Sequence, residues 1–373
     1  MNRGGISLGR ILGIQIKLDY SWFLIFALVT WTLASGYFPA EFGTWPTYEY
    51  WVVGAATAVL FFVSVLLHEL AHSVVAIHNK IPVKGINLFV FGGVSQIEQE
   101  PRSAGIEFVM AVVGPLTSFV LGGVFYGLAQ LLTFSQPLVA LTRYLAYINI
   151  LLGAFNLIPG FPLDGGRVFR SIVWAVSGNQ HRATSIAGAM GRIIGFGFVA
   201  LGVFMLFTGS FVNGLWFGFI GWFLQGAAQS EVQQQEIQDL LTGRRVSQAM
   251  RSDYTAVRPE ITLQQVVDDH ILGNGSRSFV VEEGDHMDGL LTLHNIRELP
   301  RDRWTTTTAA EAMIPLGQVK RIAPDAELWD AVEEMNRDGV SQLPVMTDGH
   351  IEGMLRREDI LNYMRNLREM SRN

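Results

Sequence analysis

Long apolar stretches fill most of the chain as far as Ala228, and polar residues become frequent after that point. About 20 consecutive, predominantly apolar residues are enough for a helix to cross a bilayer. We expect six such spans, at residues 18–38, 51–77, 106–134, 138–158, 187–207 and 211–228. The pattern predicts a polytopic α-helical membrane domain at residues 1–228.

Basic residues alternate along the connections between these spans. Lys and Arg precede the first span, follow the second and the fourth, and reappear after the sixth as Arg244 and Arg245. The connections after the first, third and fifth spans contain neither residue type. Because Lys and Arg are retained on the cytoplasmic side, we expect a multi-pass protein of the cell membrane with both termini in the cytoplasm. Arg143 departs from the pattern, and its long side chain is expected to reach the membrane surface.

Two further segments have patterns of their own. Residues 85–98 combine β-branched and aromatic residues with the pair Gly92-Gly93, which favours a short β-hairpin or re-entrant segment over a helix. Residues 229–243 are polar and are expected to form a helical linker.

After this linker the chain repeats itself. Strand-like and helix-like segments alternate, and we expect one repeat at residues 244–305 and a second at 306–373. Three pairs of positions share one constant spacing: Phe279 and Leu343, Gly289 and Gly353, and Asn295 and Asp359. Two similar units can bury apolar faces against each other, so the repeat predicts a C-terminal α/β module.

The composition of the chain limits which partners and which metal ligands are possible. The chain has 373 residues, 49% of them hydrophobic, and a formal net charge of −6 at pH 7. The negative charge offers no basic surface for a nucleic acid, and we expect no nucleic-acid partner. Because the chain has no cysteine, a bound metal would need His and carboxylate ligands.

The pentapeptide His68-Glu69-Leu70-Ala71-His72 ends the second apolar stretch, and the run from Trp51 to Leu67 before it carries no charge. Positions i and i+4 share one helix face, so both histidines can bind one zinc ion with Glu69 close by. Ionisable residues are costly inside a bilayer, which favours a functional role over a structural one. His68 lies about 26 Å along the span, within the membrane and nearer its cytoplasmic side.

A zinc hydrolase needs a third protein ligand and one open position. The best candidate is Asp164, which follows Pro159 and Pro162 at the end of the fourth span and precedes Gly165-Gly166. The prolines end the helix, and the glycines allow close approach of the backbone. The Asp164 carboxylate can therefore face the pentapeptide from a neighbouring span.

Together these motifs resemble the site-two protease family of intramembrane zinc metalloproteases. The resemblance covers residues 1–228 and rests on four motifs: the pentapeptide, Gly92-Gly93, Gly114-Pro115 and the segment 156–166. One position departs from the family, because Ser118 stands where the wider family often has Asn.

The resemblance implies one zinc ion per chain, with His68, His72 and Asp164 as its ligands. It makes Glu69 the catalytic residue that takes a proton from the attacking water and returns it to the leaving amine. It also implies substrate-positioning roles for Asn156, Gly92 and Gly93. The plain alternatives are hydrogen bonding between helices for Asn156 and Ser118, close helix packing for Gly114, and positions at the membrane surface for Asp19, His78 and Glu107.

The C-terminal repeat resembles a tandem pair of CBS domains, modules that commonly pair and bind adenine nucleotides. In that family's nucleotide motif, a Ser or Thr is followed three residues later by an Asp that contacts ribose. The first repeat keeps Thr292 but has Asn295, and the second keeps Asp359 but has Arg356. The resemblance implies an adenine nucleotide at Thr292 and Asp359 and a homodimer formed through these modules. The alternative is a purely structural or dimerising module.

Two functions of different classes are therefore open. The first is an intramembrane zinc endopeptidase that cuts membrane-embedded substrate segments, with the CBS pair as a cytoplasmic sensor. The second is a CBS-gated membrane transporter or channel that uses His68, Glu69 and His72 as an ion site. Only the peptidase explains a Glu between two His together with Asp164 on a broken helix. On that interpretation, an unwound substrate is expected to add as a strand to residues 85–98.

Overall fold

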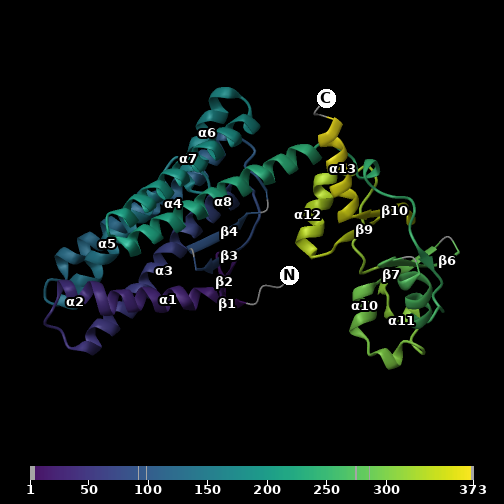
Figure 1. Ribbon diagram of the computed structural model, residues 1–373, viewed down its shortest axis with the longest axis horizontal. Helices are drawn as coiled ribbons and strands as arrows, with labels where there is room; N and C mark the ends of the chain where they lie inside the picture. Colours follow the sequence, from purple (N-terminus) through teal and green to yellow (C-terminus); the bar gives the residue numbers. More distant parts are fainter. Residues whose placement is uncertain (1–4, 91, 98, 274, 285, 371–373) are drawn as a thin grey trace. The chain divides into compact units, whose positions relative to one another are not determined.

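The computed structural model describes residues 5–370 of the chain, apart from residues 91, 98, 274 and 285. The chain divides into two compact units, Met1–Gln235 and Glu236–Asn373. The first unit is helical apart from one small sheet, and the second alternates strands and helices (Figure 1).

Among the described residues of the first unit, five helices are long and apolar enough to cross a membrane. The first span runs Ser21–Glu41 and consists of α1 Ser21–Thr32, a π-helical turn Leu33–Tyr37 and α2 Phe38–Glu41. The others are α3 Thr47–His78, α4 Ala104–Leu131, α5 Gln136–Asn156 and α7 Gln180–Phe207. These five agree with the first five predicted spans, and the chain is an integral membrane protein built on α-helices.

The sixth predicted span, residues 211–228, is the first part of a longer helix, α8 Phe211–Leu241. This helix falls outside the five that meet the length and hydropathy requirements. Glycines, tryptophans and the polar residues Asn213 and Gln225 lower the hydropathy of its first part. Because α8 continues to Leu241, the sixth predicted span and most of the predicted linker form one element.

A four-stranded sheet contacts α3 in the first unit. Its strands are β1 Gly5–Ile11, β2 Ile14–Asp19, β3 Val83–Phe89 and β4 Gly92–Ile97, in the order β1-β2-β3-β4. Neighbouring strands are antiparallel, except that β2 and β3 are parallel. β3 and β4 form the predicted hairpin, in which Phe91 and Glu98 lie outside the described residues.

The apolar pattern does not anticipate β1 and β2. β2 includes Leu18, the expected start of the first span, so that span begins later, at Ser21. Alternate residues of β2, namely Ile14, Ile16 and Leu18, are buried in a cluster with Val65 and Leu70 of α3. The strand therefore buries one face against the helix that carries the pentapeptide.

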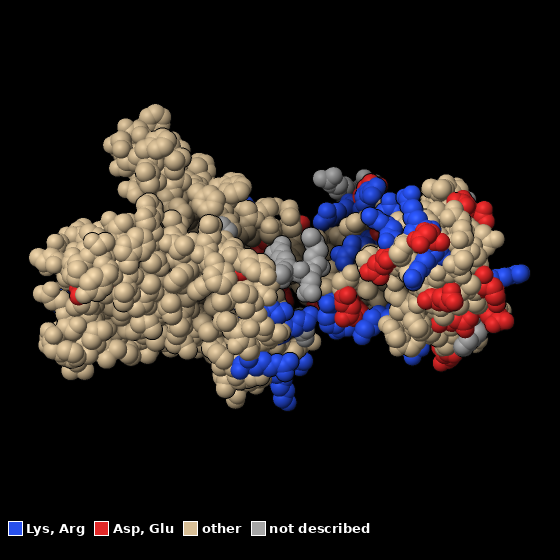
Figure 2. All heavy atoms as spheres, turned by 90° about the horizontal axis from the view of Figure 1, so that it is seen from below, with Lys and Arg blue, Asp and Glu red and all other residues tan. Residues whose placement is uncertain are grey.

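Large apolar side chains cover much of the surface of the first unit, among them Leu24, Trp31, Phe196 and Phe207. In Figure 2 this unit shows almost no charged residue along its helices, and basic residues gather at the end where the sheet lies. A soluble monomer rarely exposes so large an apolar surface, and contact with lipid explains it.

A short helix, α6 Asp164–Ser177, connects the fourth and fifth spans. It is strongly amphipathic and too short to cross a bilayer, so a search for apolar windows does not detect it. A left-handed Gly178, with a φ of +66°, caps its C-terminal end.

The second unit is the predicted α/β module. One sheet has the order β5-β6-β7-β8, and β9 pairs with β10. The strands are β5 Ala256–Val257, β6 Ser278–Glu283, β7 His286–Thr292, β8 Ile314–Pro315, β9 Gln342–Thr347 and β10 His350–Arg356. The α-helices are α9 Leu263–Gln265, α10 Leu293–Glu298, α11 Ala309–Ala312, α12 Leu328–Asp338 and α13 Arg357–Met370. A π-helical segment Val266–Leu272 and short 3-10 turns Val246–Gln248 and Arg301–Arg303 complete it.

The internal repeat is visible in the two hydrophobic cores of this module. Phe279, Leu291 and Ile296 are buried in one core, and Leu343, Leu355 and Ile360 are buried in the other. The members of the two sets occupy equivalent positions, at the constant spacing that the sequence shows. Each repeat therefore buries the same face of its hairpin and following helix.

Candidate metal centre

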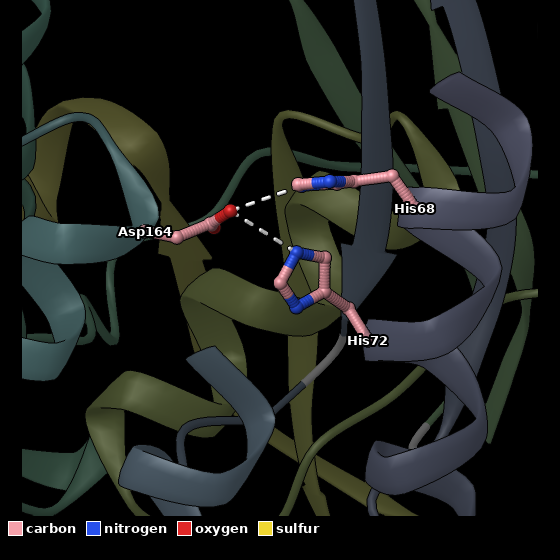
Figure 3. A group of neighbouring side chains, drawn as sticks. All are labelled: His68, His72 and Asp164. Atoms are coloured by element: carbon pink, nitrogen blue, oxygen red, sulfur yellow. Dashed lines mark hydrogen bonds and ion pairs between the residues drawn. The ribbon is translucent and has the colours of Figure 1, made fainter. Parts of the chain in front are cut away.

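The three predicted metal ligands lie together in the first unit. His68 and His72 are one turn apart on α3, and Asp164 is the first residue of α6 (Figure 3). The Oδ2 atom of Asp164 lies 3.0 Å from Nε2 of His68 and 3.3 Å from Nε2 of His72. One ligand atom from each residue lies within 4.8 Å of the other two, a spacing that suits one shared metal ion.

The other ring nitrogens orient the two imidazoles. Nδ1 of His68 lies 2.9 Å from Oγ of Ser118, and Nδ1 of His72 lies 2.6 Å from the main-chain oxygen of Met110. A histidine ligand usually donates its second N–H to such an oxygen, which turns the opposite nitrogen toward the metal. Ser118 therefore contacts a proposed ligand rather than only joining two helices.

Nε2 of His72 has an unusual environment. It is buried and lacks a well-formed hydrogen bond among the residues that the structure describes, although Oδ2 of Asp164 lies 3.3 Å away. A buried nitrogen without a hydrogen bond is costly, and coordination to a metal ion would satisfy it. The chemistry of the three ligands therefore fits zinc.

Gly114 on α4 provides the space that both imidazoles occupy. A Cβ atom at this position would lie 2.1 Å from Nε2 of His72 and 2.7 Å from Nε2 of His68. Any side chain here would displace the two nitrogens that face Asp164. The Gly114-Pro115 motif thus borders the candidate metal centre, which close helix packing alone would not require.

A tight turn carries the chain from α5 to Asp164. A Cβ atom at Gly165 would lie 2.3 Å from the main-chain carbon of Leu157, and one at Gly166 would lie 2.4 Å from that of Gly160. These glycines let α6 begin directly against the end of α5, which brings Asp164 to the histidines. Burial tends to raise the pKa of the Asp164 carboxyl, but His72 and His68 outweigh it and hold this pKa below its usual range.

Glu69 contacts the hairpin strand β4. Oγ of Ser95 donates a hydrogen bond of 2.8 Å to Oε2 of Glu69, and a Cβ atom at Gly93 would lie 2.5 Å from Cγ of Glu69. Gly92 has a φ of +126°, a conformation that only glycine adopts readily. The Gly92-Gly93 pair therefore allows both the backbone shape of the hairpin and its close contact with Glu69.

A cavity of about 490 Å³ opens onto these residues and is large enough for several side chains of a bound peptide. Its walls include the proposed ligands, Glu69 and the three predicted substrate-positioning residues Asn156, Gly92 and Gly93. Nδ2 of Asn156 donates a hydrogen bond of 3.0 Å to the main-chain oxygen of Leu152, within its own helix.

A buried ion pair beside the centre is not anticipated by the sequence. Nε of Arg170 on α6 donates to Oε1 of Glu107 on α4 at 2.5 Å, and the two side chains are 4% and 2% exposed. Arg170 also contacts Glu100 and Thr184. Glu107, which the sequence places near the end of a span, is therefore buried in a contact between α4 and α6. Ser95 is the other residue that sequence reasoning did not single out, since a lone serine in a hairpin has no distinctive pattern.

The predicted nucleotide residues lie in the second unit and both have partners within it. Thr292 caps α10 and its hydroxyl contacts Oδ1 of Asn295 at 2.5 Å. Asp359 is 6% exposed, and its Oδ1 forms an ion pair with Nε of Arg251 at 2.8 Å. Its Oδ2 accepts from the main-chain N–H of Arg356 at 3.2 Å. A ribose hydroxyl would therefore compete with Arg251 for Asp359.

Two family models match the chain. The model of peptidase family M50 matches residues 56–142 and 130–200, and the CBS domain model matches residues 246–302 and 309–366.

Known proteins are similar to the chain over most of its length. A Mycobacterium tuberculosis protein named as a zinc metalloprotease, Rip3, is 34% identical over 351 residues, which cover 93% of this chain and 89% of that protein. Zinc metalloprotease MJ0392 from Methanocaldococcus jannaschii is 27% identical, with 96% of each chain covered. The solved structure of a site-2 protease from the same organism is 29% identical, covers 61% of this chain and 95% of its own, and has a TM-score of 0.43.

Proposed function

The chain belongs to peptidase family M50, the site-two type of membrane zinc metalloprotease, and we propose that its active centre consists of His68, His72, Asp164 and Glu69. The first three residues would hold one zinc ion, and Glu69 would act as the general base. The observation that carries this proposal is the convergence of three ligand atoms within 4.8 Å at the wall of a cavity that Glu69 also lines.

Two imidazole nitrogens and one carboxylate oxygen leave a fourth coordination position for water or substrate. When bound, zinc would polarise the substrate carbonyl and make a water molecule nucleophilic at neutral pH. Ser118 and Met110 keep the two imidazoles turned toward Asp164, so the ligands are oriented before a metal arrives.

Glu69 transfers the proton in this mechanism. Its carboxylate takes a proton from the attacking water as the new C–O bond forms, and returns it to the amine as the peptide C–N bond breaks. One water is consumed for each bond cut. The position of Glu69 next to both histidines, on the wall of the cavity, supports this role.

The substrates of this family are membrane-embedded protein segments, and we propose that such a segment binds along β4. β4 is an edge strand of the sheet and lines the cavity beside Glu69. A transmembrane helix hides its peptide groups in its own hydrogen bonds, whereas an unwound segment added to an edge strand presents them. If proline substitutions along β4 left cleavage unchanged, this mode of binding would be excluded.

For the second unit we propose a cytoplasmic adenine-nucleotide sensor that forms homodimers. The match to tandem CBS domains and the carboxylate at Asp359 support this role.

The alternation of basic residues supports a protein of the cell membrane with both termini cytoplasmic, which requires α8 to cross as well. A reporter enzyme that is active only outside the cytoplasm should stay inactive when it is fused to the C-terminus. Light scattering of the full-length protein should give the mass of a dimer.

The central test combines zinc content with cleavage of a membrane-embedded test substrate by the full-length protein in liposomes. His68→Ala should lose both zinc and cleavage, because it removes a ligand. Glu69→Gln should keep about one zinc per chain and lose cleavage at least about 100-fold, because only the base is removed.

His78→Ala is the matched control, because His78 is an exposed histidine at the end of the same helix. It should retain wild-type zinc content and cleavage. Full cleavage by Glu69→Gln, or unchanged zinc in His68→Ala, would contradict the proposed centre. The transporter or channel alternative instead predicts ion flux without peptide cleavage, and the family match favours the peptidase.

A further inference from the structure

Strand β4 runs along the face of α3 that carries Glu69. Alternate residues of a strand share one face, and on β4 this face consists of Gly93, Ser95 and Ile97. Gly93 and Ser95 both contact Glu69. Ile97 packs in the same cluster as Ala76, two turns further along the helix. The strand and the helix are therefore in contact over three successive positions, beginning at the proposed base.

The hydroxyl of Ser95 has one proton and three oxygen neighbours. These are Oε2 of Glu69 at 2.8 Å, the main-chain oxygen of Glu69 at 3.2 Å and Oγ of Ser73 at 3.2 Å. Ser73 lies 3.0 Å from the same main-chain oxygen and can donate to it. The carboxylate oxygen is the nearest of the three, and in the ionised form that a general base needs it is the strongest acceptor. The Ser95 proton therefore goes to Oε2 of Glu69.

This hydrogen bond matters because the last torsion of a glutamate side chain is otherwise weakly defined. A fixed donor on one carboxylate oxygen sets the plane of the group and leaves the second oxygen to meet a water molecule. We propose that Ser95 is a positioning residue that orients Glu69 for proton transfer. This inference rests on the proposed function of Glu69 as the base.

The position of Ser95 also connects base and substrate. Ser95 lies on the edge strand that we propose receives the unwound substrate, so the group that orients Glu69 and the backbone that orients the peptide belong to one element. Gly93, two residues earlier, lies against the side chain of Glu69. Because it has no side chain of its own, it keeps the distance between Ser95 and Glu69 short. A substrate paired correctly with β4 would then meet a base that is already oriented.

The test is a comparison of Ser95→Ala and Ser95→Thr with the wild type, using the full-length protein in liposomes. Ser95→Ala should lower kcat about 10-fold to 100-fold and leave KM within about twofold, because it affects proton transfer and not binding. Zinc content and Tm should match the wild type. Ser95→Thr keeps the hydroxyl on a side chain that suits a strand, and should recover most of kcat.

Ser73→Ala is the matched control. It removes an identical hydroxyl from the same cluster, but that hydroxyl reaches only the main-chain oxygen of Glu69 and Ser95, not the carboxylate. Its kcat should stay close to that of the wild type. Wild-type kcat in Ser95→Ala, an equal loss in Ser73→Ala, or no recovery in Ser95→Thr would each overturn the inference.

Failure of the inference can be told apart from failure of the proposed function. If Glu69→Gln abolishes cleavage while Ser95→Ala is fully active, Glu69 is the base and Ser95 does not position it. If Glu69→Gln remains active, the proposed function itself fails.

Discussion

Small residues at the metal centre matter for the space they leave. Gly114 provides room for both Nε2 atoms, and Gly93 provides room for the side chain of Glu69. Neither glycine has a positive φ, so each is needed for close approach rather than for an unusual backbone conformation. Conformational strain is therefore not the reason to expect a defect when either is replaced.

Gly114→Ala should abolish zinc binding while the protein still folds. The new methyl group would lie 2.1 Å from Nε2 of His72, and the imidazoles can rotate away from it only by leaving their ligand positions. Zinc content by mass spectrometry and Tm would measure the two effects separately. Gly123→Ala is the control, because Gly123 lies on the same helix with nothing within 4 Å of its added Cβ. Normal zinc content in Gly114→Ala would contradict the geometry.

At the scale of elements, α6 explains how the proposed zinc ligand Asp164 is held far along the chain from the pentapeptide. Asp164 starts this helix, and two turns later Arg170 anchors it to α4 through Glu107. Both charges are buried, so removal of one partner would leave the other unpaired away from water. The ion pair therefore fixes the helix that presents Asp164.

Arg170→Ala should lower the free energy of unfolding by about 3–5 kcal/mol, because Glu107 stays buried without its partner. Arg167→Ala on the same helix should cost less than about 1 kcal/mol, since its contact with Glu231 at 3.7 Å involves a side chain that is 43% exposed. Denaturant titration in detergent would measure both. A double variant, Arg170→Met with Glu107→Gln, should recover part of the loss. Similar values for the two single arginine variants would show that the buried pair has no special role.

The elements also show where the apolar pattern succeeds. It predicts α3, α4 and α5 well, because about 20 apolar residues in a row have few alternatives to a spanning helix. It does not detect β1, β2 or α6, since these elements are too short to form an apolar window. β2 is stabilised by parallel pairing with β3, for example Ile16 with Ile86, which lies beyond the first two spans in the chain.

At the scale of the whole molecule, a peptidase unit and a CBS pair are joined in one chain. Membership in the family accounts for the first unit. The role of the second unit depends on whether it binds a ligand. A nucleotide would have to compete with Arg251 for the carboxylate of Asp359.

ATP or AMP should raise the Tm of the full-length protein, because a ligand that binds only the folded state stabilises it, by about 2.7 kcal/mol at 100 times its Kd. Asp359→Asn should remove this shift if the carboxylate accepts a ribose hydroxyl. Asp325→Asn, a change at an exposed aspartate of the same repeat, should keep it. No shift for the wild type at millimolar nucleotide would leave the module with a structural or dimerising role.

The sequence by itself determined the features that depend on neighbouring residues. The i, i+4 spacing of His68 and His72, the apolar run before them and the constant spacing between the CBS repeats are local or periodic. Asp164 could also be selected from sequence, because prolines and glycines mark the broken helix around it. These patterns are enough to predict the class of protein and a candidate ligand set.

Only the tertiary structure decided which side chains support that set. Ser95 meets Glu69 across 26 residues, Ser118 meets His68 across 50, and Arg170 meets Glu107 across 63. No local pattern encodes these pairs, because they depend on how separate helices and one strand pack. Packing between segments that are distant in the chain, not composition or periodicity, therefore sets the orientation of the proposed base and of the proposed ligands.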